Sequence, residues 1–216
     1  MGTEAQVVAL IGGTGGVGRH VLERALASGH EVRALVRDPS RLTPRAGLTV
    51  VEGSVLDEVA VDRLCEGADI VVSCLGTRGG EPPVVAPGTA VILQAMARKG
   101  VQRMTVISSV GIGDSGPQGR RVSRFFMYLI VPLFLRERFY ELERMEALVR
   151  SSDVGWVIIR PTGLGKGAAT GAYRIRGADS LETSMRVNRA DVAHCIVDLV
   201  SDTRWDGQAI SVFAGP

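Results

Sequence analysis

The sequence has few cysteines and almost no lysine. The cysteines Cys65, Cys74 and Cys195 are odd in number, far apart and outside any Cys-x-x-Cys pair, which argues against disulfides and a cysteine metal site. Lys99 and Lys166 are the only lysines, so arginine supplies nearly all the basic charge. A high-GC coding bias explains this, although arginine also suits forked contacts with phosphate. The net charge of +2 gives no case for a nucleic-acid or membrane surface.

Long hydrophobic runs are also missing. The most apolar stretch, residues 125–135, covers 11 residues and is interrupted by Pro132, whereas a membrane-spanning helix needs about 20 apolar residues. We interpret it as a buried or interface helix, with a pocket wall or a membrane-surface contact as the alternatives. The first ten residues have neither the basic start nor the cleavage pattern of a signal peptide. We therefore expect a cytoplasmic protein without a transmembrane segment, acting as a monomer or weak homo-oligomer.

Histidine is equally scarce. His20 and His30 belong to the N-terminal part of the chain and His194 to a late helix-like run, so we expect structural roles for all three. No His-Glu-x-x-His pattern, Cys/His cluster or carboxylate cage is visible, so no metal site is predicted. The Gly-x-Ser-x-Gly pattern of serine hydrolases does not occur either.

None of the three tyrosines is followed four residues later by a lysine, although many short-chain dehydrogenases use Tyr-x-x-x-Lys to move a proton. The nearest approach is Tyr140 with Arg144. We interpret this pair as a helix-surface contact, with stabilisation of a phenolate as the alternative. Ketone reduction by the Tyr–Lys route is therefore not expected. Hydride transfer to an acceptor that needs little acid catalysis, such as a flavin, quinone or bilin, remains open.

Strand-like and helix-like runs alternate along the whole chain. The strand-like runs are apolar without a polar–apolar alternation, which indicates a parallel sheet covered on both faces. We predict one α/β domain over residues 1–216: a Rossmann fold with a doubly wound, mainly parallel sheet and a small C-terminal substrate lobe. Asn188 is expected to cap the last helix. Strands are predicted at 6–11, 31–37, 48–53, 68–76, 101–111, 155–161 and 208–213, and helices at 17–29, 56–67, 88–100, 136–152 and 188–202.

Five glycines fall within residues 12–18, between the first predicted strand and the first predicted helix. At this junction Gly12 suits the tight turn, Gly15 lets the backbone approach a pyrophosphate, and Gly18 lets the helix pack on the strand. The start of the helix adds N–H groups and a positive dipole end. The segment therefore predicts a dinucleotide site.

The end of the second predicted strand indicates which dinucleotide binds. Enzymes that use NAD usually place an acidic residue there, whereas this chain has Arg37, with Arg41 one turn later. An arginine fork suits a 2′-phosphate, so the sequence predicts NADP(H). Asp38 leaves an alternative open, because its carboxylate could bind a 2′-hydroxyl.

Several further stretches carry a family resemblance. The pattern "GGTGGVG…LVRDPSRL…GSVLD…VSCLGTR…VISS" resembles the NmrA-like group of atypical short-chain dehydrogenase/reductases. Within that group the chain looks most similar to the NADPH-dependent flavin reductases, also called biliverdin reductase B. More specific pieces are "LGTR" at 75–78, "TGAY" at 170–173 and "WDGQAIS" at 205–211. The resemblance covers nearly the whole chain.

The resemblance implies roles for single residues. Val55 and Asp57 would flank the adenine, and Pro161 and Thr162 would lie beside the nicotinamide. Ser109 would face the nicotinamide and the substrate, and is the candidate catalytic residue. The candidate cofactor-binding residues are Gly12, Thr14, Gly15, Gly16, Val17, Gly18, Arg37, Arg41, Val55, Asp57, Gly76, Thr77, Arg78, Ser108, Pro161 and Thr162.

The chain also departs from the flavin reductases, because Thr162 stands where they carry a histidine. The glycine-rich segment 160–177 is predicted to be a mobile loop in which Arg174 and Arg176 face an anionic acceptor or are simply solvated. The sequence predicts an NADPH-dependent reductase of a planar conjugated small molecule (a flavin, bilin or quinone). The alternative is a non-catalytic NADP(H)-binding redox sensor or assembly factor of the NmrA type.

Overall fold

A computed structural model of the chain describes residues 4–76, 82–112, 131–177 and 186–215, with side chains from residue 137 onward in the third segment. The strands are β1 (Val7–Ile11), β2 (Glu31–Val36), β3 (Leu48–Glu52), β4 (Ile70–Ser73), β5 (Arg103–Ile107), β6 (Gly155–Pro161), β7 (Gly163–Gly165), β8 (Tyr173–Gly177), β9 (Arg186–Asn188) and β10 (Gln208–Ala214). The helices are α1 (Gly18–Ala27), α2 (Glu58–Cys65), α3 (Val85–Lys99), α5 (Val131–Arg150) and α6 (Arg189–Asp198), with a 3-10 turn, η1, at Pro39–Arg41.

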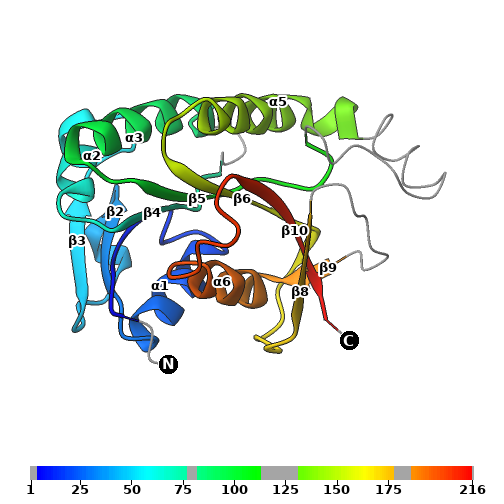
Figure 1. Cartoon of the computed structure of the whole chain (residues 1–216), viewed down its shortest axis with the longest axis horizontal. Coiled ribbons are helices and arrows are strands. Elements are labelled where there is room, and N and C mark those ends of the chain that lie inside the picture. Colours follow the sequence, from blue (N-terminus) through cyan, green and yellow to red (C-terminus); the bar gives the residue numbers. More distant parts are fainter. Residues whose placement is uncertain (1–3, 77–81, 113–130, 178–185, 216) are drawn as a thin grey trace.

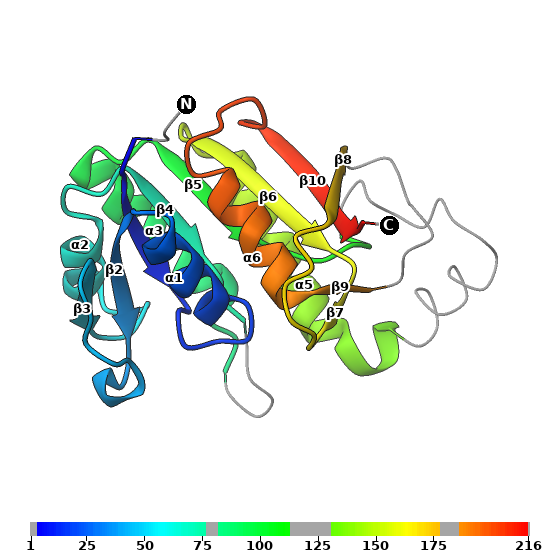
Figure 2. The same ribbon diagram turned by 90° about the horizontal axis from the view of Figure 1, so that it is seen from below.

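Eight strands form one sheet in the order β3-β2-β1-β4-β5-β6-β10-β8. Neighbouring strands from β3 to β10 run parallel, and only the edge strand β8 is antiparallel. Helices α2, α3 and α5 cover one face and α1 and α6 cover the other (Figures 1 and 2). Strands buried on both faces need apolar side chains throughout, which explains the unbroken apolar runs of β1 and β4. The predicted fold class is confirmed.

Two hydrophobic clusters fill the space between the sheet and its helices. One packs Leu10 and Ile159 of the sheet against α1 and α6. The other packs Ile11 and Ile158 against α2, α3 and α5. Successive residues of each strand therefore serve opposite clusters, and the sheet is fixed in register from both sides.

The predicted elements are all present, with boundaries that shift by a few residues. Helix α3 begins at Val85, three residues before the predicted start, and ends at Gly100, whose φ of +72° terminates the helix in a left-handed turn. The apolar stretch 125–135 lies mostly outside the described residues, and its last residues, from Val131, begin α5. The interpretation of that stretch stays a prediction.

The expectation of a loop over residues 160–177 is wrong, whereas the mobility expected of this segment stays a prediction. The segment contains β7 and β8, and β8 pairs with β10 through five residues, from Tyr173 opposite Ala214 to Gly177 opposite Ile210. Strand β7 pairs with β9 in a separate two-stranded sheet beside the start of α6. A Cβ on Gly165 of β7 would lie 2.5 Å from Asn188 Oδ1 of β9, so this glycine permits the close pairing of the two strands. These short strands form the C-terminal lobe.

Candidate functional site

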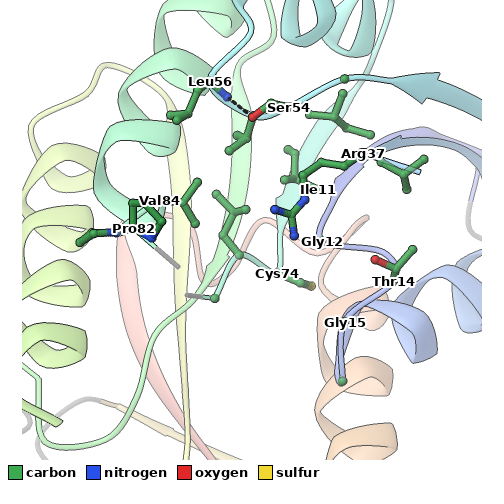
Figure 3. Close-up of a pocket in the computed structure, with 18 residues that line it drawn as sticks. Ile11, Gly12, Thr14, Gly15, Arg37, Ser54, Leu56, Cys74, Pro82 and Val84 are labelled. Carbon is green, nitrogen blue, oxygen red and sulfur yellow. Dashed lines mark hydrogen bonds between the residues drawn. The ribbon is translucent and has the colours of Figure 1, made fainter. Parts of the chain in front are cut away.

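A cleft of about 560 Å³ opens at the carboxyl ends of β1, β2, β3 and β4 (Figure 3). Ligands bind to open α/β sheets at this edge, where the order of the strands reverses on either side of β1. The cleft brings together seven predicted residues: Gly12, Thr14, Gly15, Gly16, Arg37, Val55 and Gly76. Its other lining residues include four that the sequence did not indicate: Ser54, Leu56, Cys74 and Leu75.

The glycines of the turn differ in what a side chain would meet there: Gly12 and Gly18 have no room for one, whereas Gly15 has open space beside it. Gly12 has a φ of +79°, and a Cβ there would lie 2.5 Å from the carbonyl oxygen of Cys74. A Cβ on Gly18 would collide with the carbonyl oxygen of Gly12. The chain needs these two glycines for its own packing. A Cβ on Gly15, in contrast, would meet only the Gly12 carbonyl oxygen at 3.1 Å, so this position leaves cleft space open for another molecule.

This turn fits the pyrophosphate of a dinucleotide. Gly15 and Gly16 line the cleft directly before α1, whose first turn begins at Gly18. The backbone N–H groups at the start of a helix, together with its dipole, attract anions. Figure 3 shows the Thr14 side chain beside the same turn. The cleft therefore has open space at Gly15 and a positive helix end beside it, where two phosphates would have to lie.

Arg37 and Asp38 differ in their surroundings. Arg37 lines the cleft and extends its guanidinium into it (Figure 3). The Asp38 carboxylate caps η1 instead, since its Oδ1 accepts hydrogen bonds from the Ser40 backbone N–H at 3.1 Å and the Ser40 hydroxyl at 2.6 Å. Asp38 thus has a local structural function, and the cationic side chain occupies the cleft.

The turn after β3 lines the part of the cleft where the adenine is predicted to lie. Val55 is buried, and Leu56 is 51% exposed, which is unusual for a leucine. The Ser54 hydroxyl accepts a hydrogen bond from the Leu56 N–H at 3.2 Å and so shapes the turn. The Asp57 carboxylate caps α2, because it accepts hydrogen bonds from the backbone N–H groups of Val59 and Ala60. Its predicted place beside the adenine stays a prediction.

The carboxyl ends of β5 and β6 lie next to the carboxyl end of β4, at the edge of the sheet where the cleft opens. The Ser108 N–H donates to the Ile159 carbonyl at 2.7 Å, and the Val110 N–H reaches the Pro161 carbonyl at 3.4 Å. Ser108 and Thr162 are 6% and 7% exposed, and neither hydroxyl has a hydrogen-bond partner in the described part of the chain. Buried hydroxyls without partners are costly. A bound group with polar atoms, such as a nicotinamide carboxamide, would supply the missing partners.

The remaining predicted residues that the structure describes do not line the cleft itself. Ser109 follows Ser108 and donates its hydroxyl to the Val110 carbonyl at 3.2 Å. Val17 is buried at the start of α1, beneath the glycine turn, and Arg41 is exposed at the end of η1. Thr77 and Arg78 lie outside the described residues, so their placement stays a prediction.

Asn188 and Asp191, at the start of α6, hold the segment between β7 and β8. The Asn188 side chain accepts a hydrogen bond from the Gly167 N–H and donates one to the Ala168 carbonyl. Asn188 directly precedes α6, but its side chain forms no capping hydrogen bond with that helix, contrary to the prediction. The Asp191 carboxylate is 2% exposed and accepts from the N–H groups of Thr170 and Gly171. Only the tertiary fold reveals these contacts.

Two of the three tyrosines, Tyr140 and Tyr173, lie in the described part of the chain. Tyr140 is 58% exposed, with the Arg144 guanidinium 5.7 Å from its ring centre, as expected of a helix-surface pair. Tyr173 donates its hydroxyl to Asp198 at 2.6 Å. Burial and this carboxylate raise the pKa of Tyr173, so the phenol stays protonated. Tyr128 lies outside the described residues.

The cysteines are free thiols of low reactivity. Burial raises the pKa of Cys65 to about 11 and that of Cys74, which lines the cleft, to about 12. Thiols react as thiolates, so these side chains are poor nucleophiles at neutral pH. No group of His, Cys, Asp or Glu among the described residues could hold a metal ion. None of the helices that the described residues form combines the length and apolar character needed to cross a bilayer.

Comparison with known sequences identifies the family of the chain. The sequence profile described as "NAD(P)H-binding" matches residues 12–203, which begin at the glycine turn. The chain belongs to this family of NAD(P)H-binding proteins. Its cofactor is therefore a nicotinamide dinucleotide, and the predicted family is confirmed.

Two curated reductases are similar to the chain. A (4-alkanoyl-5-oxo-2,5-dihydrofuran-3-yl)methyl phosphate reductase from Streptomyces griseus is 29% identical over 97% of this chain and 68% of its own length. An isoflavone reductase homologue from Zea mays is 34% identical over 36% of this chain and 28% of its own length. The match therefore spans only about a quarter of the maize protein. These relatives place the chain among oxidoreductases.

Solved structures share the fold. An anaerobilin reductase from Escherichia coli O157:H7, ChuY, is 27% identical with a TM-score of 0.80, and the match covers 96% of both chains. A short-chain dehydrogenase/reductase from Veillonella parvula, solved in complex with NADP, is 18% identical with a TM-score of 0.83 over 97% of this chain and 95% of its own. The second likeness supports the fold alone.

Proposed function

We propose that the protein is an NADPH-dependent reductase that transfers hydride to a planar conjugated acceptor: a flavin, a bilin or a quinone. The observation that carries the proposal is the polar edge formed by Ser108, Ser109 and Thr162, next to the dinucleotide cleft. The sequence has no Tyr-x-x-x-Lys pair that could add a proton donor to this edge. Such an edge can orient two flat molecules against each other but supplies no strong acid. Conjugated acceptors need little acid catalysis, because the electrons they accept are delocalised.

The chain's own residues would bind and orient the reactants. The glycine turn would hold the pyrophosphate, and Arg37 would bind the 2′-phosphate. Ser108 and Thr162 would bind the carboxamide and so set which face of the nicotinamide ring is exposed. When bound, NADPH supplies the hydride. The acceptor gains this hydride and one proton. The Ser109 hydroxyl would turn from the Val110 carbonyl and donate its hydrogen bond to the acceptor, while water provides the proton.

The similarity to ChuY supports a bilin or a similarly shaped acceptor, because it extends over 96% of both chains at 27% identity. Two cationic side chains of this chain fit an anionic acceptor. Arg174 and Arg176 occupy alternate positions of β8, opposite Phe213 and Ser211 of β10, and are exposed. Alternate residues of a strand share one face, so both arginines lie on the side of the sheet opposite Tyr173 and Ile175. They could bind the propionates of a bilin or the phosphate of FMN.

The proposal is tested by following NADPH oxidation with FMN, riboflavin, a quinone or biliverdin, each against a reaction without acceptor. We expect at least one of these acceptors to accelerate oxidation, with small aldehydes and ketones inactive. Ser109→Ala should lower kcat without a large change in NADPH affinity. If NADPH binds but no conjugated acceptor accelerates its oxidation, the reductase proposal is wrong. A non-catalytic NADP(H)-binding sensor then becomes the better explanation.

A further inference from the structure

Arg189, the first residue of α6, lies directly against the glycine turn. A Cβ built on Gly16 would be 2.8 Å from Arg189 Nε and 3.1 Å from its Cδ. The side chain therefore passes over the backbone of the turn whose next residues open α1. Helices α1 and α6 lie side by side on the same face of the sheet, which brings these two helix starts together (Figure 2).

The guanidinium of Arg189 also reaches the segment after β6. Its Nη1 donates to the carbonyl oxygen of Gly165 at 2.8 Å and approaches that of Leu164 at 3.4 Å. Both carbonyls belong to β7, which begins one residue after Thr162. One side chain therefore connects the glycine turn to the segment that follows the predicted nicotinamide contacts.

No carboxylate of the described residues neutralises the positive charge of Arg189. Within residues 4–76, 82–112, 137–177 and 186–215, the hydrogen bonds of its guanidinium are those to the two β7 carbonyls, and no carboxylate pairs with it. Burial lowers the pKa of His20, on the first turn of α1, and the charges of Arg19 and Arg189 lower it further. A cation beside the positive end of α1 is unfavourable unless an anion joins them.

We propose that Arg189 is a further cofactor-binding residue, whose guanidinium contacts the pyrophosphate on the glycine turn while its Nη1 keeps β7 in place. The inference rests on the family's NAD(P)H binding and deepens the proposed function. It makes binding of the cofactor and ordering of the segment after β6 parts of one event. The reason is that the same guanidinium takes part in both.

Titration of two ligands separates this contact from a purely structural role. NADP+ carries the pyrophosphate, whereas adenosine 2′-monophosphate carries the 2′-phosphate without it. Loss of a charge-assisted hydrogen bond in Arg189→Gln should weaken NADP+ binding by about tenfold or more. The affinity for adenosine 2′-monophosphate should stay within about twofold, and Arg189→Lys should recover part of the loss because it restores the charge. The matched control is Arg204→Gln, because Arg204 is an exposed arginine that pairs with Asp202 away from the cleft.

Cleavage by a lysine-specific protease provides the second readout. The chain has only two lysines, Lys99 at the end of α3 and Lys166 directly after β7. We expect NADP+ to slow cleavage after Lys166 in the wild type but not in Arg189→Gln, while cleavage after Lys99 serves as the internal control. The proposal is overturned if Arg189→Gln binds NADP+ like the wild type, or if it loses both ligands equally. Neither readout depends on an acceptor, so failure of the reductase proposal would be recognised separately.

Discussion

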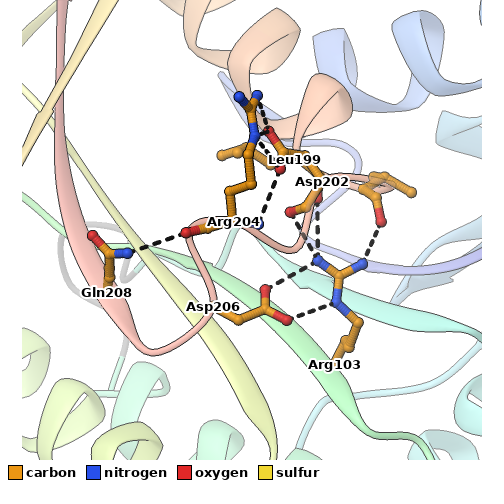
Figure 4. A network of polar contacts seen from close by, with 7 residues as sticks. Arg103, Leu199, Asp202, Arg204, Asp206 and Gln208 are labelled. Atoms are coloured by element: carbon orange, nitrogen blue, oxygen red, sulfur yellow. Dashed lines mark hydrogen bonds and ion pairs between the residues drawn. The ribbon is translucent and has the colours of Figure 1, made fainter.

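Arg103 and Asp206 are joined by a two-point ion pair at the amino edge of the sheet, opposite the cleft (Figure 4). The guanidinium donates Nη2 to Asp206 Oδ1 at 3.1 Å and Nε to Oδ2 at 3.3 Å. It also donates to the carbonyl oxygens of Val200 and Asp202. A single side chain at the start of β5 therefore fixes the connection between α6 and β10.

Arg103→Met should destabilise the fold without weakening cofactor binding. The substitution leaves carbonyl and carboxylate acceptors unpaired in a site where the Arg103 side chain is only 19% exposed. Each such acceptor costs about 1–3 kcal/mol, and part of that cost is relieved by water, so we expect a loss of about 2–3 kcal/mol in the free energy of unfolding. Urea denaturation measures the loss, and calorimetry measures the NADP+ affinity.

Arg204→Met is the matched control for stability. Arg204 also forms a two-point contact, with Asp202, but its side chain is 83% exposed. Exposed ion pairs contribute about 0–1 kcal/mol, so this variant should unfold close to the wild type. If both variants lose the same free energy of unfolding, the contacts of Arg103 stabilise the fold no more than an exposed ion pair does.

Glu146→Gln should be more damaging, because it separates a fully buried pair. Arg160 of β6 is 0% exposed and donates Nε and Nη2 to the two Glu146 oxygens of α5 at 3.0 and 2.6 Å. Removing the charge of Glu146 takes from Arg160 the carboxylate to which it donates two hydrogen bonds in the interior, and breaking a buried ion pair costs about 3–5 kcal/mol. Thermal and urea unfolding should both show the loss. The double variant Glu146→Leu with Arg160→Met should recover much of it, and a double variant as unstable as the single one would contradict this explanation.

Local sterics explain why the glycine turn could be predicted from sequence. Gly12 and Gly18 are required by contacts within the turn itself, so their spacing carries the information directly. The positions of Ser54 and Leu56 could also be predicted, because they follow β3 at the same edge of the sheet where Gly12 follows β1. Asp57 directly precedes α2, and an aspartate at this position is a local sequence pattern typical of a helix cap.

Long-range contacts explain what the sequence could not reveal. Strands β7 and β9 have three residues each, too few for any periodicity, and Asn188 at the end of β9 also holds the chain directly after β7. The partners of Asp191 lie 20 and 21 residues away. Nothing in the glycine-rich composition of 160–177 distinguishes a segment held by such contacts from a mobile loop.

His30 should make stability fall as the pH drops. It is 5% exposed, its Nδ1 accepts a hydrogen bond from the Gln6 N–H at 3.2 Å, and burial lowers its pKa below the ordinary 6.5. The unfolded chain therefore takes up a proton below about pH 6.5 that the folded chain resists, and the free energy of unfolding decreases there. His30→Asn keeps an acceptor without titrating. Its unfolding free energy should change less between pH 7.5 and 5.5 than that of the wild type, and an unchanged difference would exclude His30 as the cause.

Gly15→Val and Gly18→Val should fail in different ways. A side chain at position 15 meets only the Gly12 carbonyl and points into the cleft, so the fold should survive while NADP+ binding is lost. A side chain at position 18 collides with the Gly12 backbone, so the protein itself should be destabilised. Circular dichroism and unfolding measure the fold, and calorimetry measures binding. Near-native NADP+ affinity in Gly15→Val would show that the pyrophosphate lies elsewhere.

Arg37 should determine the preference for NADP+ over NAD+. The side chain extends into the cleft, whereas the Asp38 carboxylate is occupied by Ser40. A charge-assisted contact with the 2′-phosphate contributes about 1.5–3 kcal/mol, which corresponds to a preference of about 10–100-fold. Arg37→Gln should remove most of this preference by weakening NADP+ binding alone, because NAD+ has no 2′-phosphate. Asp38→Asn keeps an acceptor for Ser40 and should leave the ratio unchanged. Equal affinities of the wild type for the two dinucleotides would contradict the assignment, and a loss of NAD+ binding in Asp38→Asn would assign the ribose to Asp38 instead.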